Sequence, residues 1–330
     1  MLKRVVISIT DECNLKCKHC YNEDNRVRVE EKLEYINYEF IKDLKELGVE
    51  QIGLTGGEPL TNWNVLNKLL KLFKENGFNV LITTNGLLLD RDKLDELKSN
   101  GVDIIQVSID GATKEKHEFI RGKNTYDKVI NIFKNGLHDI YNIVPMYTIN
   151  KTNYMEIEKY INIMNNYNVK QIGFERYIPV CGKYREELEL DSNILEKAYE
   201  LLYRYENRGI IIHINDPLYN IFKIKRLDKN ENFIVKELSK WDVGCSALRT
   251  SIYIDAQGNV LPCTFSNRTI FNANDTRIKI IENHLVNKKL IESKRCSKCK
   301  YGVICRGCRA AAKYSKNKDW CGDDPLCFIS

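Results

Sequence analysis

Short β-branched runs alternate with longer amphipathic segments over the first half of the chain, and this alternation restricts the fold more than any other feature. The apolar residues of the first amphipathic segment recur at helical spacing. They are Leu33, Ile36, Phe40, Ile41, Leu44 and Leu47. The expected strands are Val5–Thr10, Gln51–Thr55, Asn79–Thr84, Asp103–Ile109, Asn142–Ile149 and Lys170–Tyr177. Such alternation predicts an α/β fold with a parallel sheet and right-handed crossovers.

Six strand–helix units are too few for a closed eight-fold barrel, so the sheet is either an open partial barrel or doubly wound. Polar motifs follow the strands at their carboxyl ends, which is where barrel enzymes keep their active sites. Cys13–Cys20 follows the first strand, Gly56–Glu58 the second and Asn85 the third, while Ser108 and Asp110 close the fourth. This distribution favours an open (β/α)6 partial TIM barrel. Gly48, Gly77 and Gly101 are expected to cap helices in the left-handed conformation.

The second half of the chain has a different texture. A helix is expected at Leu195–Tyr205 and a short strand at Ile210–Ile214, while Ser251–Asp255 and Asn259–Pro262 predict a β-hairpin. Eight of the twelve cysteines lie between Cys245 and Cys327. We therefore expect three parts: a barrel over 1–215, a bridging helical segment over 216–240 and a separate cysteine-rich domain over 241–330.

Composition excludes several classes of function. The net charge of +6 is spread along the chain without a dense basic block, so no nucleic-acid partner is expected. No apolar run is long enough to cross a membrane, and the short run at Val5–Ile9 is followed at once by acidic residues, unlike a secretion signal. A cytoplasmic chain with clustered cysteines is better interpreted as binding metal than as forming disulfides.

Cys13, Cys17 and Cys20 place three thiols within eight residues, directly before Tyr21. A loop with this spacing can bind three corners of a 4Fe–4S cluster and leave the fourth iron open, as catalytic metal sites do. A methionine amine and carboxylate could chelate that iron. The alternatives are a structural zinc knuckle and a redox cysteine pair.

This cysteine loop resembles the signature of the radical SAM superfamily, in which S-adenosylmethionine (SAM) binds the open iron. The motif Gly56-Gly57-Glu58 resembles the glycine-rich motif that contacts the methionine amine in that family; alone it would be a common turn. The resemblance implies that Ser108 and Arg121 bind polar parts of SAM, although Arg121 could instead form a surface salt bridge. Further candidates for the cofactor site lie at neighbouring strand ends. They are Thr84, Asn85, Asp110 and Asn150.

Two histidines and one cysteine near these motifs receive no ligand role. His19 lies inside the cysteine loop and is expected to be exposed. His117 precedes Arg121 by four residues, on the same helical face, and is not treated as a metal ligand. Cys181 follows the sixth strand and is expected to be a spare buried thiol.

The C-terminal cysteines resemble the SPASM extension of radical SAM enzymes, which holds one or two auxiliary 4Fe–4S clusters. The resemblance implies that one cluster has four cysteine ligands and the other three. The first set is Cys296, Cys299, Cys305 and Cys327, and the second is Cys245, Cys263 and Cys308. Cys321 could replace Cys327 as the closing ligand. Only two residues separate Cys305 from Cys308, where many members have three. Zinc is the alternative metal.

The resemblance implies that a reduced cluster cleaves SAM to a 5′-deoxyadenosyl radical, which abstracts hydrogen from a substrate. Ferredoxin or flavodoxin is the expected electron donor. Oxidative modification of a peptide or protein is the favoured reaction. Peptide-modifying members often carry an N-terminal recognition domain; the first strand starts near Val5, so this domain is not expected here, and another chain could supply it. Maturation of a cofactor, such as a modified haem formed by oxidative decarboxylation or a tungsten cofactor, is the alternative. A non-catalytic iron–sulfur electron carrier and a zinc-bound interaction protein are alternatives from other classes.

Overall fold

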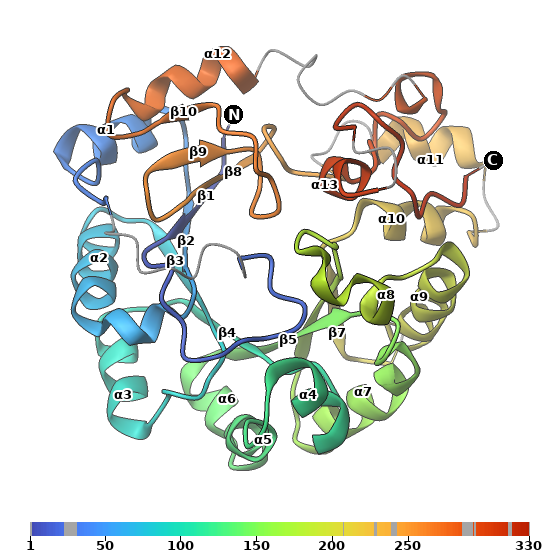
Figure 1. Ribbon diagram of the computed structural model, residues 1–330, viewed down its shortest axis with the longest axis horizontal. Helices are drawn as coiled ribbons and strands as arrows, with labels where there is room; N and C mark the ends of the chain where they lie inside the picture. The colour runs from blue at the N-terminus through green and yellow to red at the C-terminus, as the bar shows by residue number, and fades with distance from the viewer. Residues whose placement is uncertain are drawn as a thin grey trace.

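A single ten-stranded sheet organises the computed structural model, which describes residues 2–22, 32–206, 208–227, 230–238, 243–285, 293, 295–315 and 319–329. The strands are β1 (Arg4–Ser8), β2 (Gln51–Thr55), β3 (Asn79–Thr84), β4 (Ile104–Ser108), β5 (Ile143–Ile149), β6 (Gln171–Arg176), β7 (Ile211–Ile214), β8 (Ser251–Ile254), β9 (Asn259–Leu261) and β10 (Phe271–Asn272). Their spatial order is β10-β9-β8-β1-β2-β3-β4-β5-β6-β7. The run from β8 to β7 is parallel and curves into an open barrel (Figure 1).

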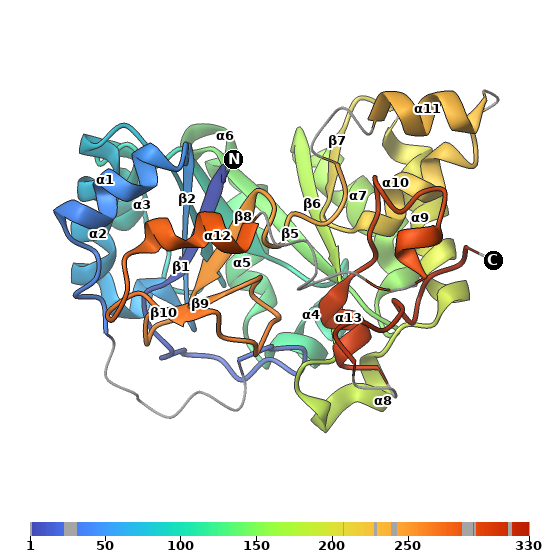
Figure 2. The same cartoon turned by 90° about the horizontal axis from the view of Figure 1, so that it is seen from above.

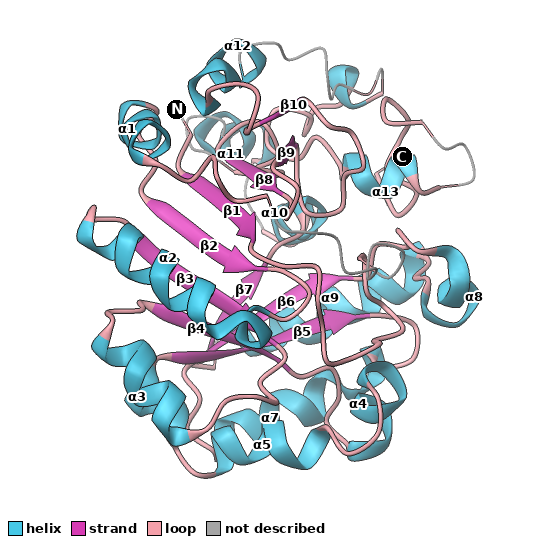
Figure 3. Cartoon of the chain, turned by 60° about the vertical axis from the view of Figure 1, so that its left-hand side comes forward, coloured by secondary structure: helices cyan, strands magenta, loops and turns pink. Residues whose placement is uncertain are grey.

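Helices follow the strands and cover the outer face of the sheet, as Figure 3 shows for α2, α3 and α5. The helices are α1 (Tyr38–Glu46), α2 (Trp63–Glu75), α3 (Arg91–Ser99), α4 (Lys114–Arg121), α5 (Tyr126–Lys134), α6 (Leu137–Tyr141), α7 (Ile157–Asn166), α8 (Arg185–Leu188), α9 (Ser192–Glu206), α10 (Pro217–Ile224), α11 (Glu231–Leu238), α12 (Ile281–Leu285) and α13 (Arg309–Lys313). Seen from above, α9, α10 and α13 lie on the side of the barrel opposite α1, α2 and α3 (Figure 2). None of the described helices combines the length and apolarity that crossing a lipid bilayer requires.

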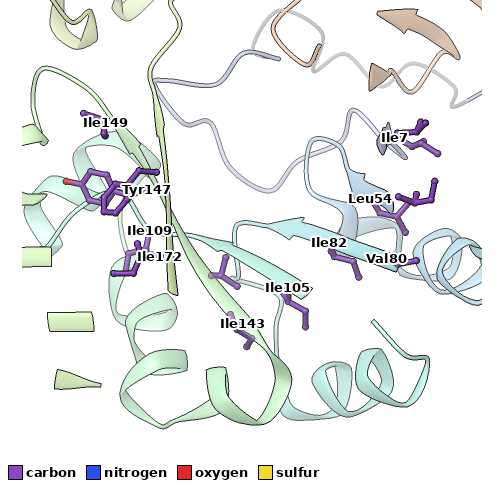
Figure 4. Close-up of a cluster of buried hydrophobic side chains, with 14 of the residues drawn as sticks. Ile7, Leu54, Val80, Ile82, Ile105, Ile109, Ile143, Tyr147, Ile149 and Ile172 are labelled. Carbon is purple, nitrogen blue, oxygen red and sulfur yellow. The ribbon is translucent and has the colours of Figure 1, made fainter. Parts of the chain in front are cut away.

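The main core lies between the sheet and this outer layer of helices. Successive strand residues point to opposite faces, so Val5, Ile7 and Ile9 are fully buried in this core. The same layer continues through the neighbouring strands, and Figure 4 shows part of it around Leu54 and Ile105. The intervening residues of β1 face the inside of the barrel, where the functional groups gather.

The expected strands and the hairpin are confirmed to within two residues at each end. The glycines that follow α1, α2 and α3 have the predicted positive φ, for example 77° at Gly48. The predicted start of the first helix is wrong. The Asn37 side chain accepts a hydrogen bond from the Phe40 amide at 3.1 Å and caps the helix, so α1 starts at Tyr38. Leu33 and Ile36 precede the helix and still pack against the core.

The C-terminal hairpin continues the barrel sheet, although we expected it in a separate domain. Strand β8 pairs with β1 in parallel, with Arg4 opposite Ser251, and β9 then runs antiparallel to β8. The other edge is extended by β7, which pairs in parallel with β6. The expected boundary between residues 240 and 241 lies outside the described residues.

Candidate active site

The three cysteines of the N-terminal motif lie in the loop after β1, and each sulfur faces an N–H donor. The Leu15 amide donates to Cys13 Sγ at 3.4 Å, and the Asn22 amide donates to Cys20 Sγ at 3.4 Å. Arg121 Nη1 lies 4.0 Å from Cys17 Sγ. Donors of this kind stabilise thiolates and tune iron–sulfur clusters. The surroundings of all three sulfurs therefore fit a thiolate-ligated cluster.

Cys17 is the buried member of the three. Burial raises the pKa of its thiol to about 12, and the nearby Arg121 guanidinium partly opposes this rise. A metal that binds Cys17 must therefore displace a proton from it. Within the described residues, no three His, Cys, Asp or Glu side chains converge as a single metal ion requires. The cysteines of a cubane bind different irons, whereas a zinc ion takes all of its ligands on one metal.

The two glycines after β2 let two loops pack against each other. A Cβ atom on Gly56 would lie 2.4 Å from the Thr10 carbonyl oxygen, and one on Gly57 would lie 2.2 Å from that of Glu12. The Gly57 amide donates to the Thr10 carbonyl at 2.7 Å, and the Glu58 amide donates to that of Glu12 at 2.8 Å. The glycine motif therefore holds the start of the cysteine loop in place.

Glu58 connects this motif to the end of β3. Its carboxylate is fully buried and accepts hydrogen bonds from the Thr84 hydroxyl at 2.7 Å, the Asn85 amide at 2.7 Å and the Leu60 amide at 3.1 Å. Burial raises its pKa, and these three donors oppose the rise. The Asn85 side chain in turn donates to the Asn14 side chain in the cysteine loop at 2.7 Å. The cysteine loop is therefore supported by a chain of hydrogen bonds: Glu58 holds Thr84 and Asn85, and Asn85 holds the loop.

Asp110 accepts hydrogen bonds from three elements beside the same loop. Arg121 Nε of α4 donates to its Oδ2 at 2.5 Å, His19 Nε2 lies 3.0 Å from that oxygen, and the Thr148 amide of β5 donates to Oδ1 at 2.7 Å. Burial works against ionisation of Asp110, but Arg121 and His19 outweigh it and hold the pKa below its ordinary value. The expectation that His19 is exposed is wrong, because its side chain is only 9% exposed and turns inward to this carboxylate.

His117 is fully buried on α4 and accepts a hydrogen bond from the Asp110 amide at Nδ1, 3.2 Å away. Burial, followed by the Arg121 charge, lowers its pKa to about 3, so the ring is neutral. Asn150 is also fully buried. Its side chain accepts from the Thr152 amide and hydroxyl and donates to the Thr148 carbonyl. Asn150 therefore shapes the turn after β5.

One cavity of about 440 Å³ occupies the inside of the barrel. Ser108 and Arg121 line it near the cysteine loop, and Cys245, Cys263 and Cys308 line it as well. The cavity thus places the predicted SAM-binding residues and one predicted set of C-terminal cysteines around a common space. Its size is within the range of small-molecule sites.

Glu175 on β6 lines the same cavity, and our sequence reasoning missed it. Burial raises its pKa to about 7, and the negative charge of Asp110 adds to this rise. The only sequence signal was its position two residues after Gly173 on one face of the strand. Burial similarly raises the pKa of Cys308 to about 11.

A second cavity, of about 380 Å³, is lined by the other predicted cysteine set. That set is Cys296, Cys299, Cys305 and Cys327. Two of these sulfurs face donors: Gly307 N lies 3.4 Å from Cys305 Sγ, and Arg309 Nη2 lies 3.7 Å from Cys296 Sγ. The two cavities are therefore lined by different C-terminal cysteines, and the role of each set as cluster ligands stays a prediction.

Cys321 and Cys181 lie apart from these two groups. Cys321 is exposed and lines neither of the two cavities. Cys181 is buried, as expected, and its Sγ lies 3.5 Å from the Tyr21 carbonyl oxygen.

An open parallel barrel with a three-cysteine loop at the carboxyl end of its first strand defines a class of iron–sulfur enzymes, and sequence comparison identifies the family. The sequence profile of the radical SAM superfamily matches residues 7–164. The chain is 31% identical to a probable GTP 3′,8-cyclase of Archaeoglobus fulgidus, covering 80% of this chain and 86% of that protein. The chain therefore belongs to the radical SAM superfamily and is an enzyme.

Two further comparisons extend over nearly the whole chain. The Fe-coproporphyrin III synthase of Methanosarcina barkeri is 27% identical, covering 99% of this chain and 88% of that protein. The structure of Streptococcus suis SuiB bound to its precursor peptide SuiA superposes with a TM-score of 0.79 at 20% identity, covering 100% of this chain and 76% of that one. At that identity, the likeness to SuiB concerns the fold alone.

Proposed function

We propose that the chain cleaves SAM reductively and oxidises a substrate held inside the barrel. When bound, the cluster and SAM supply a 5′-deoxyadenosyl radical that abstracts a hydrogen atom from the substrate. Cys13, Cys17 and Cys20 would hold the cluster, and Ser108 and Arg121 would bind polar groups of SAM. The observation that carries this proposal is the common cavity, which Ser108 and Arg121 line together with Cys245, Cys263 and Cys308, while Arg121 Nη1 lies 4.0 Å from Cys17 Sγ.

The chain's own residues would position these groups and exclude water. Glu58 and Asp110 fix the loops around the cysteines through buried hydrogen bonds. The interior of the barrel would keep other hydrogen donors away from the reacting atoms. We assign residues 241–330 to a SPASM-type region with two auxiliary clusters, and we infer ferredoxin or flavodoxin as the electron donor. Thiolate-held clusters of this kind suit the reducing cytoplasm.

For the substrate, we propose a cofactor precursor. The support comes from sequence relatives that match almost the full chain and are named for tetrapyrrole synthesis, including an AdoMet-dependent heme synthase of Methanosarcina barkeri at 26% identity over 97% of this chain and 94% of that protein. A peptide or protein is the second candidate. Like a cofactor precursor, a peptide substrate would have to place an oxidisable group inside the barrel, and a SuiB-like fold is compatible with this.

Anaerobic reconstitution tests SAM cleavage. The protein is incubated with dithionite and SAM without substrate, and 5′-deoxyadenosine is measured by chromatography. We expect product from the native chain and none after replacement of Cys13, Cys17 and Cys20 by Ala. Cys321→Ala is the matched control, since this exposed thiol lies outside both cavities, and it should retain cleavage. No product from native protein with intact iron would refute the proposed function.

Substrate class is tested by the same readout. A carboxylated iron tetrapyrrole is added to the reconstituted enzyme, and the rate of 5′-deoxyadenosine formation is compared with the substrate-free rate. A higher rate, with a change in mass of the tetrapyrrole, supports the cofactor class. An unchanged rate and an unmodified tetrapyrrole contradict it.

A further inference from the structure

Arg4 introduces a positive charge into the barrel far from the cysteine loop. It begins β1 and lies opposite Gln51 of β2 and Ser251 of β8. Its side chain lines the 440 Å³ cavity and lies beside Gly53 of β2, where a Cβ would be 3.5 Å from Arg4 Nη2. Arg4 lies four positions before Ser8 at the end of β1, a distance of about 13 Å along the strand.

The Arg4 guanidinium has no partner that matches its charge. Its Nε is buried without a hydrogen-bond partner in the part of the chain that the structure describes, and no ion pair involves this side chain there. Burial lowers the pKa of Arg4, and the more distant Glu175 carboxylate raises it. A half-buried arginine whose Nε is shielded from water and lacks a hydrogen-bonded counterion is destabilised. A ligand that brings an anionic oxygen would remove this cost.

We propose that Arg4 anchors a carboxylate of the substrate in the amino-terminal half of the barrel. This inference rests on the proposed function, because it places the substrate in the cavity beside the SAM-binding residues. A guanidinium fork matches the two oxygens of a carboxylate or a phosphate. When Glu175 is protonated, the single positive charge of Arg4 balances the single charge of a carboxylate better than the double charge of a phosphate. The substrate class is therefore a carboxylic acid whose carboxylate sits at Arg4.

Glu175 opposes this anion from β6 and should make binding depend on pH. Several groups surround it: Arg4 from β1, Asp110 after β4, Arg121 from α4, Tyr21 from the cysteine loop, and the Thr148 hydroxyl of β5 at 3.5 Å. The pKa of Glu175 is raised to about 7 by burial and then by Asp110. Below this pH, Glu175 is neutral and a ligand carboxylate is not repelled. Carboxylate binding should therefore tighten as the pH falls from 8 to 6.

The test uses reconstituted protein with saturating SAM and a simple probe, propionate, at constant ionic strength. A ligand that binds the folded state stabilises it by RT ln(1 + [L]/Kd), so the rise in melting temperature over a titration gives the dissociation constant. We expect propionate to stabilise the native chain, while neutral propionamide has no effect and phosphate has a smaller one. Arg4→Gln should weaken propionate binding at least about tenfold. Lys3→Gln, a neighbouring loss of charge at an exposed position, is the matched control and should leave binding unchanged.

Two further variants keep the proposal falsifiable if Arg4→Gln folds poorly. Arg4→Lys keeps the charge and should retain part of the effect. Glu175→Gln should bind propionate more tightly than the native chain at pH 8 and lose the pH dependence. Absence of stabilisation by propionate, an equal effect in Arg4→Gln, or a stronger effect of phosphate would each overturn the proposal. SAM cleavage is measured separately, so active protein that ignores propionate refutes only this inference, and inactive protein that binds it refutes only the proposed function.

Discussion

At the scale of single residues, Asp110 has the densest set of polar contacts in the site. It is fully buried and joins β5, α4 and the cysteine loop through Thr148, Arg121 and His19. Arg121 is itself 9% exposed, so neither charge of the pair can be satisfied by bulk water. The pair therefore depends on both partners being present.

Asp110→Asn should leave Arg121 buried without a counterion, and breaking such a pair costs about 3–5 kcal/mol. We expect a corresponding fall in the free energy of unfolding, measured by chemical denaturation under anaerobic conditions. Asp127→Asn is the matched control, since Asp127 is 64% exposed and pairs with exposed Lys114 at 2.5 Å; exposed pairs contribute little. Similar losses in the two variants would show that Asp110 does not hold the site together.

The residues of the site were predictable from the sequence only where they belong to a motif. Cys13, Asp110 and Arg121 stood out by spacing or by position after a strand. No motif singled out Glu175 or Arg4, because they share a cavity only once the sheet curves and one face of each strand turns inward. The inward position of His19 was not predictable, because its partner, Asp110, is 91 positions away in the sequence.

At the scale of elements, the loops after β1 and β2 act as one unit. Gly56 and Gly57 suggested close approach of a ligand, and the structure shows close approach of backbone to backbone. The roles proposed for them toward SAM remain predictions. Strand positions were predictable because β-branched runs end at clear turn residues. The start of α1 was not, since apolar spacing alone did not reveal the Asn37 cap.

Gly57→Ala should separate the two loops, because its Cβ would lie 2.2 Å from the Glu12 carbonyl oxygen and 2.6 Å from that of Asp11. Backbone must move to relieve this contact, at a cost of roughly 1–3 kcal/mol. We expect a lower melting temperature and loss of iron from the N-terminal cluster. Gly182→Ala is the control, since nothing lies within 4 Å of its Cβ position. Full iron content in Gly57→Ala would contradict the proposed support role.

At the scale of the whole molecule, the cysteine-rich region is built onto the barrel. Besides the β8–β1 pairing, Arg176 of β6 forms buried ion pairs with Asp216 at 3.0 Å and Asp324 at 2.5 Å. Asp324 also accepts a hydrogen bond from the Cys308 amide at 2.8 Å. These contacts join positions up to about 250 residues apart, so cysteine spacing and local composition could not reveal them. They attach Cys308 and the segment around Asp324 to strand β6 of the barrel.

Iron content tests how this assembly distributes its clusters. Three cubanes predict about twelve irons per chain. Replacing Cys13, Cys17 and Cys20 by Ala should lower this to about eight irons and abolish SAM cleavage.

Replacing Cys296 and Cys299 by Ala should likewise leave about eight irons, but some SAM cleavage should persist, because the cavity that Cys296 and Cys299 line includes none of the N-terminal cysteines. Cys327→Ala should resemble this variant, since Cys327 lines the 380 Å³ cavity, whereas Cys321→Ala should keep the full content. Iron and sulfide analysis after anaerobic purification provides the measurement. Zinc in place of iron at the C-terminal cysteines would refute the auxiliary clusters, and loss of iron in Cys321→Ala would move the closing ligand to Cys321.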